Sequence, residues 1–266
     1  MKTFNIQKAG VFVAVVLIGG ILFSGCSLFQ KRYEKTEKKE FSINVSGKKR
    51  VVLDNTNGDI KIVKNTSDSM LRIKAEGTFH LTKKEMKEEL DRIRIHIDST
   101  GEEIKIKTDY IKEKRFINFQ FNIGSEIDYE LAVPEGIEVS VDNTNGKAEV
   151  KDVNNDISLN ITNGGIYFDN PTGNLKVDIT NGKIKGELDS ARGVNFKITN
   201  GSISLALGDN FSGRFNLETV NGKIKTNDIS FKDISKENKN FKGNLGDGKA
   251  EIIMETINGS IKLSKK

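Results

Sequence analysis

An Asn-Gly dipeptide recurs along the 266-residue chain, and this repeat limits the possible fold more than any other feature. The copies are Asn57-Gly58, Asn145-Gly146, Asn163-Gly164, Asn181-Gly182, Asn200-Gly201, Asn221-Gly222 and Asn258-Gly259. From Asn145 to Asn221 they are 18, 18, 19 and 21 residues apart, and we interpret the last separation, of 37 residues, as two units. A period near 20 residues indicates a repeat array.

The residues around each copy share one pattern. The position before Asn is β-branched in every copy, and the position three after Asn is Ile in all copies but one, which has Ala. Alternating β-branched residues favour strands on both sides of the dipeptide. Gly accepts a positive φ, and Asn tolerates it better than most residues, so the dipeptide predicts a tight turn.

Two geometries fit such a turn. In the first, Asn-Gly is a type I′ hairpin turn, which would place Asp54 opposite Lys61 and Asp178 opposite Lys185 as cross-strand pairs. The same geometry would pair Glu218 with Lys225 and Glu255 with Lys262. In the second, Asn-Gly is a corner of a solenoid whose coils stack, so that the Asn side chains form a ladder.

We favour the solenoid for two reasons. A long meander with one apolar face needs a covering layer, whereas a solenoid encloses its own core between two sheets. The residue after Gly in five successive copies is Lys147, Gly165, Lys183, Ser202 and Lys223, so lysines would alternate with small residues and avoid like-charge stacking. The predicted fold is all-β, a β-solenoid or β-helix-like array over residues 136–266.

Residues 41–135 are expected to form an N-terminal capping region with the first repeat copy and one short helix. Thr82 to Glu85 form a capping box, and Met86 and Leu90 continue an apolar stripe, which predicts a helix from Lys83 to about Arg92. Strand pairs are expected around Ser99–Gly101 and around Gly124-Ser125. Residues Lys232–Lys242 are expected to form a charged loop that interrupts the array.

Near the N-terminus, an uncharged run is followed by Leu22-Phe23-Ser24-Gly25-Cys26. This segment resembles a bacterial lipoprotein signal peptide. The resemblance implies removal of residues 1–25 and lipidation of Cys26, with a membrane as the partner of the lipid anchor. Phe23 departs from the pattern, which usually has Leu at the third position before the Cys. Residues 26–40 are expected to form a polar tether.

The stretch Tyr129-Glu130-Leu131-Ala132-Val133-Pro134-Glu135-Gly136, followed by the Asn-Gly array, resembles the bacterial putative-adhesin family of β-strand-repeat, toastrack-like domains. That family has no known function. The resemblance covers roughly Phe41 to Lys266 and implies a β-helix-like fold at the cell envelope. It carries no functional residues over to this chain.

Few residues suggest catalysis or metal binding. Cys26 is the only Cys, and His80 and His96 are the only histidines, with His96 expected to face solvent. Asp54 to Asp59 superficially suggests a calcium loop but lacks the spaced acids and the distal Glu. Forty-two basic against 37 acidic residues, without a separate basic stretch, does not indicate nucleic-acid binding. We expect that the chain is not an enzyme and that it binds no cofactor or metal.

Three functions are considered. The first is an envelope-tethered, extracytoplasmic interaction module that binds cell-wall glycan or an envelope or host protein. The second is a structural or envelope-stress-associated lipoprotein without a dedicated ligand. The third, a polysaccharide-acting β-helix enzyme, would need an acidic or basic cluster in one groove.

Overall fold

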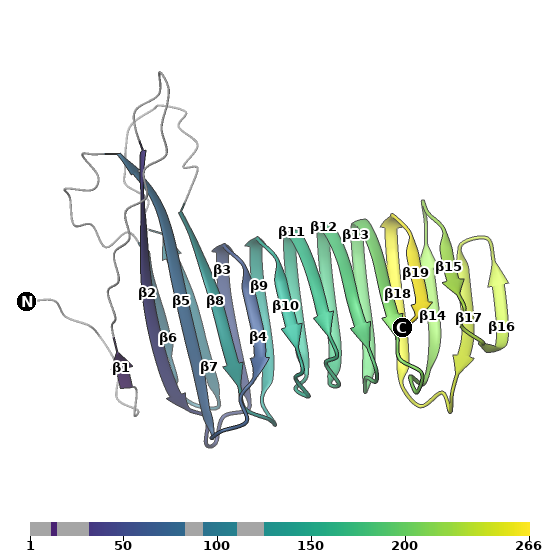
Figure 1. Cartoon of the computed structure of the whole chain (residues 1–266), viewed down its shortest axis with the longest axis horizontal. Coiled ribbons are helices and arrows are strands. Elements are labelled where there is room, and N and C mark those ends of the chain that lie inside the picture. Colours follow the sequence, from purple (N-terminus) through teal and green to yellow (C-terminus); the bar gives the residue numbers. More distant parts are fainter. Residues whose placement is uncertain (1–11, 15–31, 83–92, 111–124) are drawn as a thin grey trace, which may run out of the picture.

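The computed structural model describes residues 12–14, 32–82, 93–110 and 125–266, and their regular structure consists of strands that stack into an elongated array (Figure 1). The strands are β1 (Phe12–Ala14), β2 (Arg32–Asn44), β3 (Arg50–Asn57), β4 (Ile60–Lys64), β5 (Met70–Thr82), β6 (Ile93–Asp98), β7 (Glu103–Tyr110), β8 (Ser125–Val133), β9 (Glu138–Asn145), β10 (Ala148–Lys151), β11 (Ile157–Asp169), β12 (Asn174–Leu188), β13 (Gly193–Leu207), β14 (Gly213–Thr219), β15 (Ile224–Asn227), β16 (Lys232–Glu237), β17 (Asn240–Leu245), β18 (Glu251–Asn258) and β19 (Ile261–Lys265).

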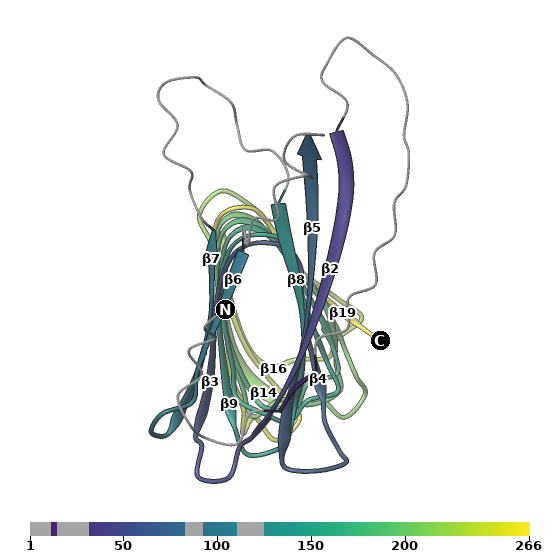
Figure 2. The same cartoon turned by 90° about the vertical axis from the view of Figure 1, so that its left-hand side faces the viewer.

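The array has two walls that face each other across the core, as Figure 2 shows along the axis. In order of hydrogen bonding, the first wall contains β6, β7, β3, β9, the first halves of β11, β12 and β13, and then β18, β14, β17 and β16. The second wall contains β2, β5, β8, β4, β10, the second halves of β11, β12 and β13, and then β19 and β15.

Neighbouring coils pair in parallel, with a register of 18 or 19 residues in the middle of the array. Asn163 pairs with Asn181, and Asn181 pairs with Asn200. Strands β11, β12 and β13 each run through their Asn-Gly pair and pass from one wall to the other. The dipeptides are therefore solenoid corners rather than hairpin turns, and the predicted all-β solenoid is confirmed.

The spatial order of the coils departs from the chain order at both ends. Strand β18 pairs with β13 on one side and with β14 on the other, so the copy at Asn258 lies between those at Asn200 and Asn221. Our interpretation of the 37-residue separation as two successive units is therefore wrong. The intervening residues form the antiparallel β16–β17 hairpin, which pairs with β14 at the end of the array, rather than the expected loop.

At the opposite end, the coil of β3 and β4 lies between the coil of β7 and β8 and the coil of β9 and β10. Residues 32–40, which were expected in the polar tether, form the first part of β2 and pair antiparallel with β5. Lys38 makes an ion pair with Glu76 of β5 at 2.9 Å. Charged side chains on a terminal strand discourage pairing with another chain, which explains their density here.

Two further predictions concern this end. The strand pair around Ser99–Gly101 is confirmed as the antiparallel pair β6 and β7. The predicted helix Lys83–Arg92 and the strand expected before Gly124 lie outside the described residues.

Among the described residues, one continuous hydrophobic core runs between the walls. Near its middle, the fully buried rings of Phe168 and Phe196 stack with centroids 5.1 Å apart and planes within 5°. These residues belong to β11 and β13, the coils on either side of β12, where Gly186 occupies the position beside Phe168 and adds no side chain. The missing side chain leaves room for the two rings to meet.

The C-terminal end of the core is closed by four phenylalanines. The ring of Phe231 lies 5.0 Å from the rings of both Phe215 and Phe241 in edge-to-face contacts, and Phe211 is 6.0 Å from Phe215. All four are buried. Aromatic pairs in this geometry add to the free energy gained from burial alone. The β16–β17 hairpin thus covers apolar surface that the last coil would otherwise expose.

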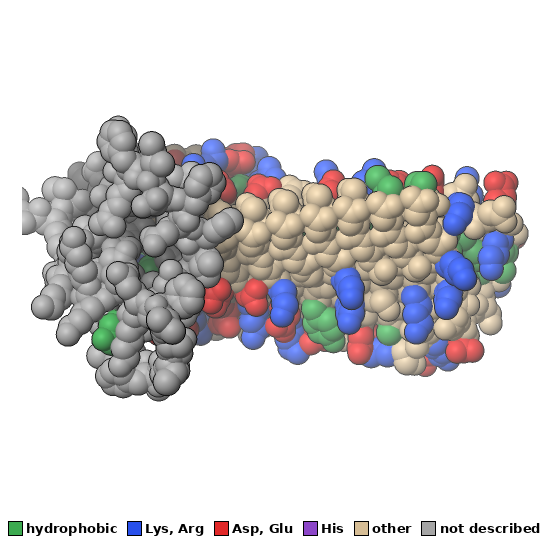
Figure 3. All heavy atoms as spheres, turned by 90° about the horizontal axis from the view of Figure 1, so that it is seen from above, with side chains coloured by type: hydrophobic (Ala, Val, Ile, Leu, Met, Phe, Trp, Pro, Cys, Tyr) green, Lys and Arg blue, Asp and Glu red, His purple; other side chains and the backbone are tan. Residues whose placement is uncertain are grey.

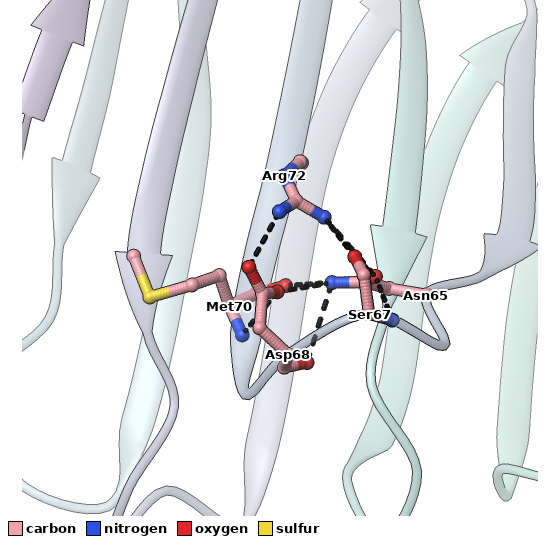
Figure 4. Close-up of polar contacts among 5 residues, drawn as sticks. All are labelled: Asn65, Ser67, Asp68, Met70 and Arg72. Atoms are coloured by element: carbon pink, nitrogen blue, oxygen red, sulfur yellow. Dashed lines mark hydrogen bonds and ion pairs between the residues drawn. The ribbon is translucent and has the colours of Figure 1, made fainter.

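The turn between β4 and β5 is built around the buried side chain of Asn65 (Figure 4). Its Nδ2 donates to Asp68 Oδ1 at 2.8 Å and to the Met70 carbonyl at 2.7 Å, and its Oδ1 accepts from Arg72 Nη1 at 3.0 Å. The hydrogen bond from Asn65 lowers the pKa of Asp68, and the Arg72 guanidinium lowers it further.

We expect Asn65→Ala to lower the free energy of unfolding by about 1–3 kcal/mol, because the buried Asn65 amide makes hydrogen bonds that alanine cannot replace. It should also raise the pKa of Asp68 towards its ordinary value of 3.8. A depressed pKa stabilises the fold above the ordinary pKa, and that gain is lost as the pH falls through the folded-state pKa. Urea unfolding at pH 7 and pH 3 should show that the free energy of unfolding falls less between the two pH values in the variant than in wild type. An equal fall in both proteins would contradict the role of Asn65 in lowering the pKa of Asp68.

Candidate functional site: the asparagine ridge and the two outer walls

The Asn side chains of all seven copies form one hydrogen-bonded ladder along the array. Six hydrogen bonds of 2.8–3.0 Å join the seven residues, and in each of them an Asn Nδ2 donates to the Oδ1 of the Asn that precedes it in spatial order. In spatial order the ladder contains Asn57, Asn145, Asn163, Asn181, Asn200, Asn258 and Asn221. Figure 3 shows this ridge as an uncharged stripe that runs along the molecule.

The glycines of the ridge are required by close contact between coils. A Cβ on Gly182 would lie 1.5 Å from the carbonyl oxygen of Gly164, and a Cβ on Gly201 would lie 1.6 Å from that of Gly182. The ridge asparagines are not among the described non-Gly residues with positive φ, whereas Asn170 in a turn on the opposite edge has a φ of 51°. The expectation that Asn is used here because it tolerates a positive φ is therefore wrong. The hydrogen-bonded ladder of Asn side chains explains the residue instead.

We expect Asn181→Ala to lower the free energy of unfolding by about 1–2 kcal/mol, because it removes the hydrogen bonds to Asn163 and from Asn200. Asn216 is the matched control, since it is also exposed on a strand and makes no side-chain hydrogen bond to a described residue. Asn216→Ala should change the value by less than about 0.5 kcal/mol. Equal effects of the two variants in urea unfolding would show that the ladder adds no stability.

The polar side chains of the calcium-like segment Asp54–Asp59, and those of the equivalent segment at Asn143, make hydrogen bonds within the protein. Asp59 Oδ1 accepts from the backbone N–H of Lys147 at 2.7 Å. The buried side chain of Asn55 donates to the Ile127 carbonyl at 3.2 Å, and the buried Asn143 donates to the Gly58 carbonyl at 3.0 Å. Both amides therefore tie one coil to the next beneath the ridge.

A shallow groove of about 330 Å³ lies on the first wall beside the ridge. It is lined by Asp54, Asp142, Asn160 and Asp178 in one row and by Thr144, Thr162 and Thr180 nearer the ridge. Asn160 Nδ2 donates to Asp142 Oδ1 at 2.8 Å. The acids thus stand in line at neighbouring coils, with an amide between two of them.

Acidic and basic residues that a hairpin would pair lie on opposite walls. The acids three positions before Asn, which include Asp178 and Glu255, lie on the first wall, and the lysines four positions after Asn, which include Lys185 and Lys262, lie on the second. Glu255 instead pairs with Lys197 on its own wall at 3.2 Å. The cross-strand pairs of the hairpin alternative are therefore absent from this part of the chain.

The remaining candidate residues lie apart from the ridge. His96 is exposed on β6, as expected, and its Nε2 lies 3.2 Å from Asp109 Oδ2. His80 lies in β5, and Cys26 lies outside the described residues. In the described ranges, no three His, Cys, Asp or Glu side chains gather closely enough to hold a metal ion. Over the same ranges, no helix has the length and apolar character needed to cross a membrane.

No protein-family model and no curated protein matches the chain. Among solved structures, it is similar to a putative cell adhesion protein from Clostridium sporogenes, with 16% identity and a TM-score of 0.46 over 87% of this chain and 100% of that one. A putative adhesin from Bacteroides fragilis has 12% identity and a TM-score of 0.30 over 85% and 97% of the two chains. A putative adhesin from Parabacteroides merdae has 9% identity and a TM-score of 0.32 over 87% and 96%.

Proposed function

We propose that this chain is a non-catalytic binding module of the bacterial cell envelope, held at a membrane by a lipid on Cys26. The observation that supports it best is the outer surface of the solenoid, where stacked coils place equivalent side chains in register along each wall. A long, regular surface suits an extended partner, such as cell-wall glycan or an extended segment of an envelope or host protein.

The arrangement of acids favours binding over glycoside hydrolysis. Hydrolysis of a glycosidic bond uses two carboxyl groups that flank the bond. In the first-wall groove, Asp54, Asp142 and Asp178 stand in one row along the axis, and Asn160 separates the last two. A chain lying along this groove would meet carboxylates in a line rather than from two sides.

The binding proposal is tested with the full chain immobilised and exposed to separated envelope fractions of wall polymer, membrane and protein. We expect retention of material from at least one fraction and none on a coated surface without the chain. Retention of no fraction would contradict the proposal and favour the structural or stress-associated alternative.

The anchor is tested by metabolic labelling with a fatty-acid analogue. Cys26→Ala should abolish labelling, because the thioether to the lipid needs the thiol, whereas Gln30→Ala should leave labelling unchanged. Unchanged labelling of Cys26→Ala would defeat the lipoprotein proposal.

A further inference from the structure

Five exposed lysines form one face on the second wall beside the ridge, and we call this the lysine face. It comprises Lys183 and Lys185 of β12, Lys223 and Lys225 at β15, and Lys262 of β19. The same two rows contain Ser202 and Ser204 of β13, and Ser260 before β19. Lysine side chains along the second-wall margin are visible in Figure 3.

None of the five lysines makes an ion pair with a described residue, although most other strands of the array carry such pairs. Lys262 and Lys225 are direct register partners on adjacent parallel strands, where like charges destabilise a sheet. Neighbouring strands lie about 4.8 Å apart, so the two lysines repel each other at short range. The nearby Glu187 is engaged with Lys266 at 2.9 Å. The face therefore carries uncompensated positive charge at a cost in stability.

Charge complementarity indicates an anionic partner, and the shape of the face indicates an extended one. Four neighbouring coils span roughly 14 Å along the axis, while the two rows are about 7 Å apart. The serines between the lysines offer hydroxyl groups for hydrogen bonds and no apolar side chain to insert into a bilayer. Tyr167, a residue that is 45% exposed, continues the row beside Lys185 and can pack against a sugar or polyol.

We propose that the lysine face binds an anionic polymer chain, with one phosphate or carboxylate per repeat, that lies along the solenoid axis. This inference rests on the proposed binding function and names the class of its partner. The lysines contact the anionic groups, and the serines and Tyr167 contact the intervening units. In the four coils that carry the lysine face, these two rows contain no carboxylate, and Glu149 stands in the row of Lys185, one coil beyond Tyr167.

The test measures binding of the full chain to poly(glycerol phosphate) and to neutral dextran. We expect Lys185→Gln/Lys225→Gln/Lys262→Gln to bind poly(glycerol phosphate) at least about tenfold more weakly than wild type, since phosphate contacts dominate such affinities. Lys176→Gln/Lys236→Gln/Lys242→Gln is the matched control, because it removes the same charge from exposed first-wall lysines that also make no ion pair with a described residue. It should bind like wild type, and wild-type binding should weaken steeply with salt.

Several results would overturn the proposal. Equal losses in both triple variants would show a non-specific charge effect, and equal binding to dextran would show that charge is not recognised. Tighter binding to phosphatidylglycerol vesicles than to the polymer would assign the face to a membrane. Salt-reversible self-association without polymer binding would assign it to the acidic wall of a second copy.

Two controls separate this inference from the proposed function and from misfolding. If the triple variant retains envelope fractions as well as wild type does, the binding function stands and the lysine face is the wrong surface. Thermal unfolding should show that the triple variant is at least as stable as wild type, because like-charge repulsion is relieved. A lower melting temperature would mean that these lysines stabilise the fold, which contradicts the premise of uncompensated charge.

Discussion

Replacing Gly182 by alanine is expected to lower the free energy of unfolding by about 4 kcal/mol, which is among the largest effects of any single substitution. The added Cβ would lie 1.5 Å from the Gly164 carbonyl oxygen and 3.1 Å from Ile179 Cγ2. The obstacle is backbone of the neighbouring coil, which cannot rotate away. Relief would require the two coils to separate, and this would stretch the Asn163–Asn181 hydrogen bond.

Gly165 provides the control for this prediction. It belongs to a neighbouring coil, and a Cβ there would meet only the Lys183 carbonyl oxygen at 3.2 Å. Gly165→Ala should change the free energy of unfolding by less than about 1 kcal/mol. Urea unfolding followed by circular dichroism measures both variants, and similar stabilities would contradict the close stacking of the glycine corners.

The second large effect is expected from Phe196→Ala, which should lower the free energy of unfolding by about 3–5 kcal/mol. Phe196 is fully buried and stacks on Phe168 at 5.1 Å. The layer at Gly186 has no side chain to fill the space that the ring would leave. The substitution therefore removes buried apolar area and an aromatic contact, and it leaves a cavity in the core.

Phe196→Leu is the control because it keeps an apolar side chain of intermediate size, and its loss should be less than half that of Phe196→Ala. The two variants are compared by urea unfolding at the same pH. If both lose the same stability, the contribution of ring stacking and cavity formation is smaller than the structure indicates.

The repeat itself could be predicted from the sequence, because the corner imposes its requirements on every copy. The β-branched residue before Asn, the Gly after it and the apolar residue two positions beyond Gly all follow from one stacked geometry. The Asn ladder also followed from the solenoid hypothesis. The positive φ expected of Gly occurs at Gly58, Gly146, Gly164 and Gly201, but the close contact of 1.5 Å at Gly182 could not be predicted, because it depends on the stacking distance between coils.

The order of the coils could not be predicted. Asn258 follows Asn221 in the chain but lies between Asn200 and Asn221, because β18 pairs with β13 on one side and with β14 on the other. A period describes the spacing of copies and contains no information about which copies become neighbours. Phe231, directly before the interrupting segment, and Phe241 within it were a usable signal that this segment covers an end of the core.

The lysine face was missed for a related reason. The position after Gly was compared along the chain, whereas Lys185, Lys225 and Lys262 stand four positions after Asn. In the hairpin alternative these lysines were matched with acids, so they offered no sign of unbalanced charge. Only the separation of the two walls reveals that their partners lie on the other side of the core.

The order of the coils is the claim on which the ridge, the core and the lysine face all depend, and one cross-linking measurement tests it. In a chain with Cys26→Ser, the pair Ser202→Cys/Ser260→Cys should form a disulfide on oxidation, because Ser260 N lies 3.2 Å from Ser202 Oγ in the adjacent coil. The pair Ser202→Cys/Lys223→Cys should not, since those coils are two strand spacings apart, or about 9.6 Å. Cross-linking of residue 202 to residue 223 and not to residue 260 would contradict the structure.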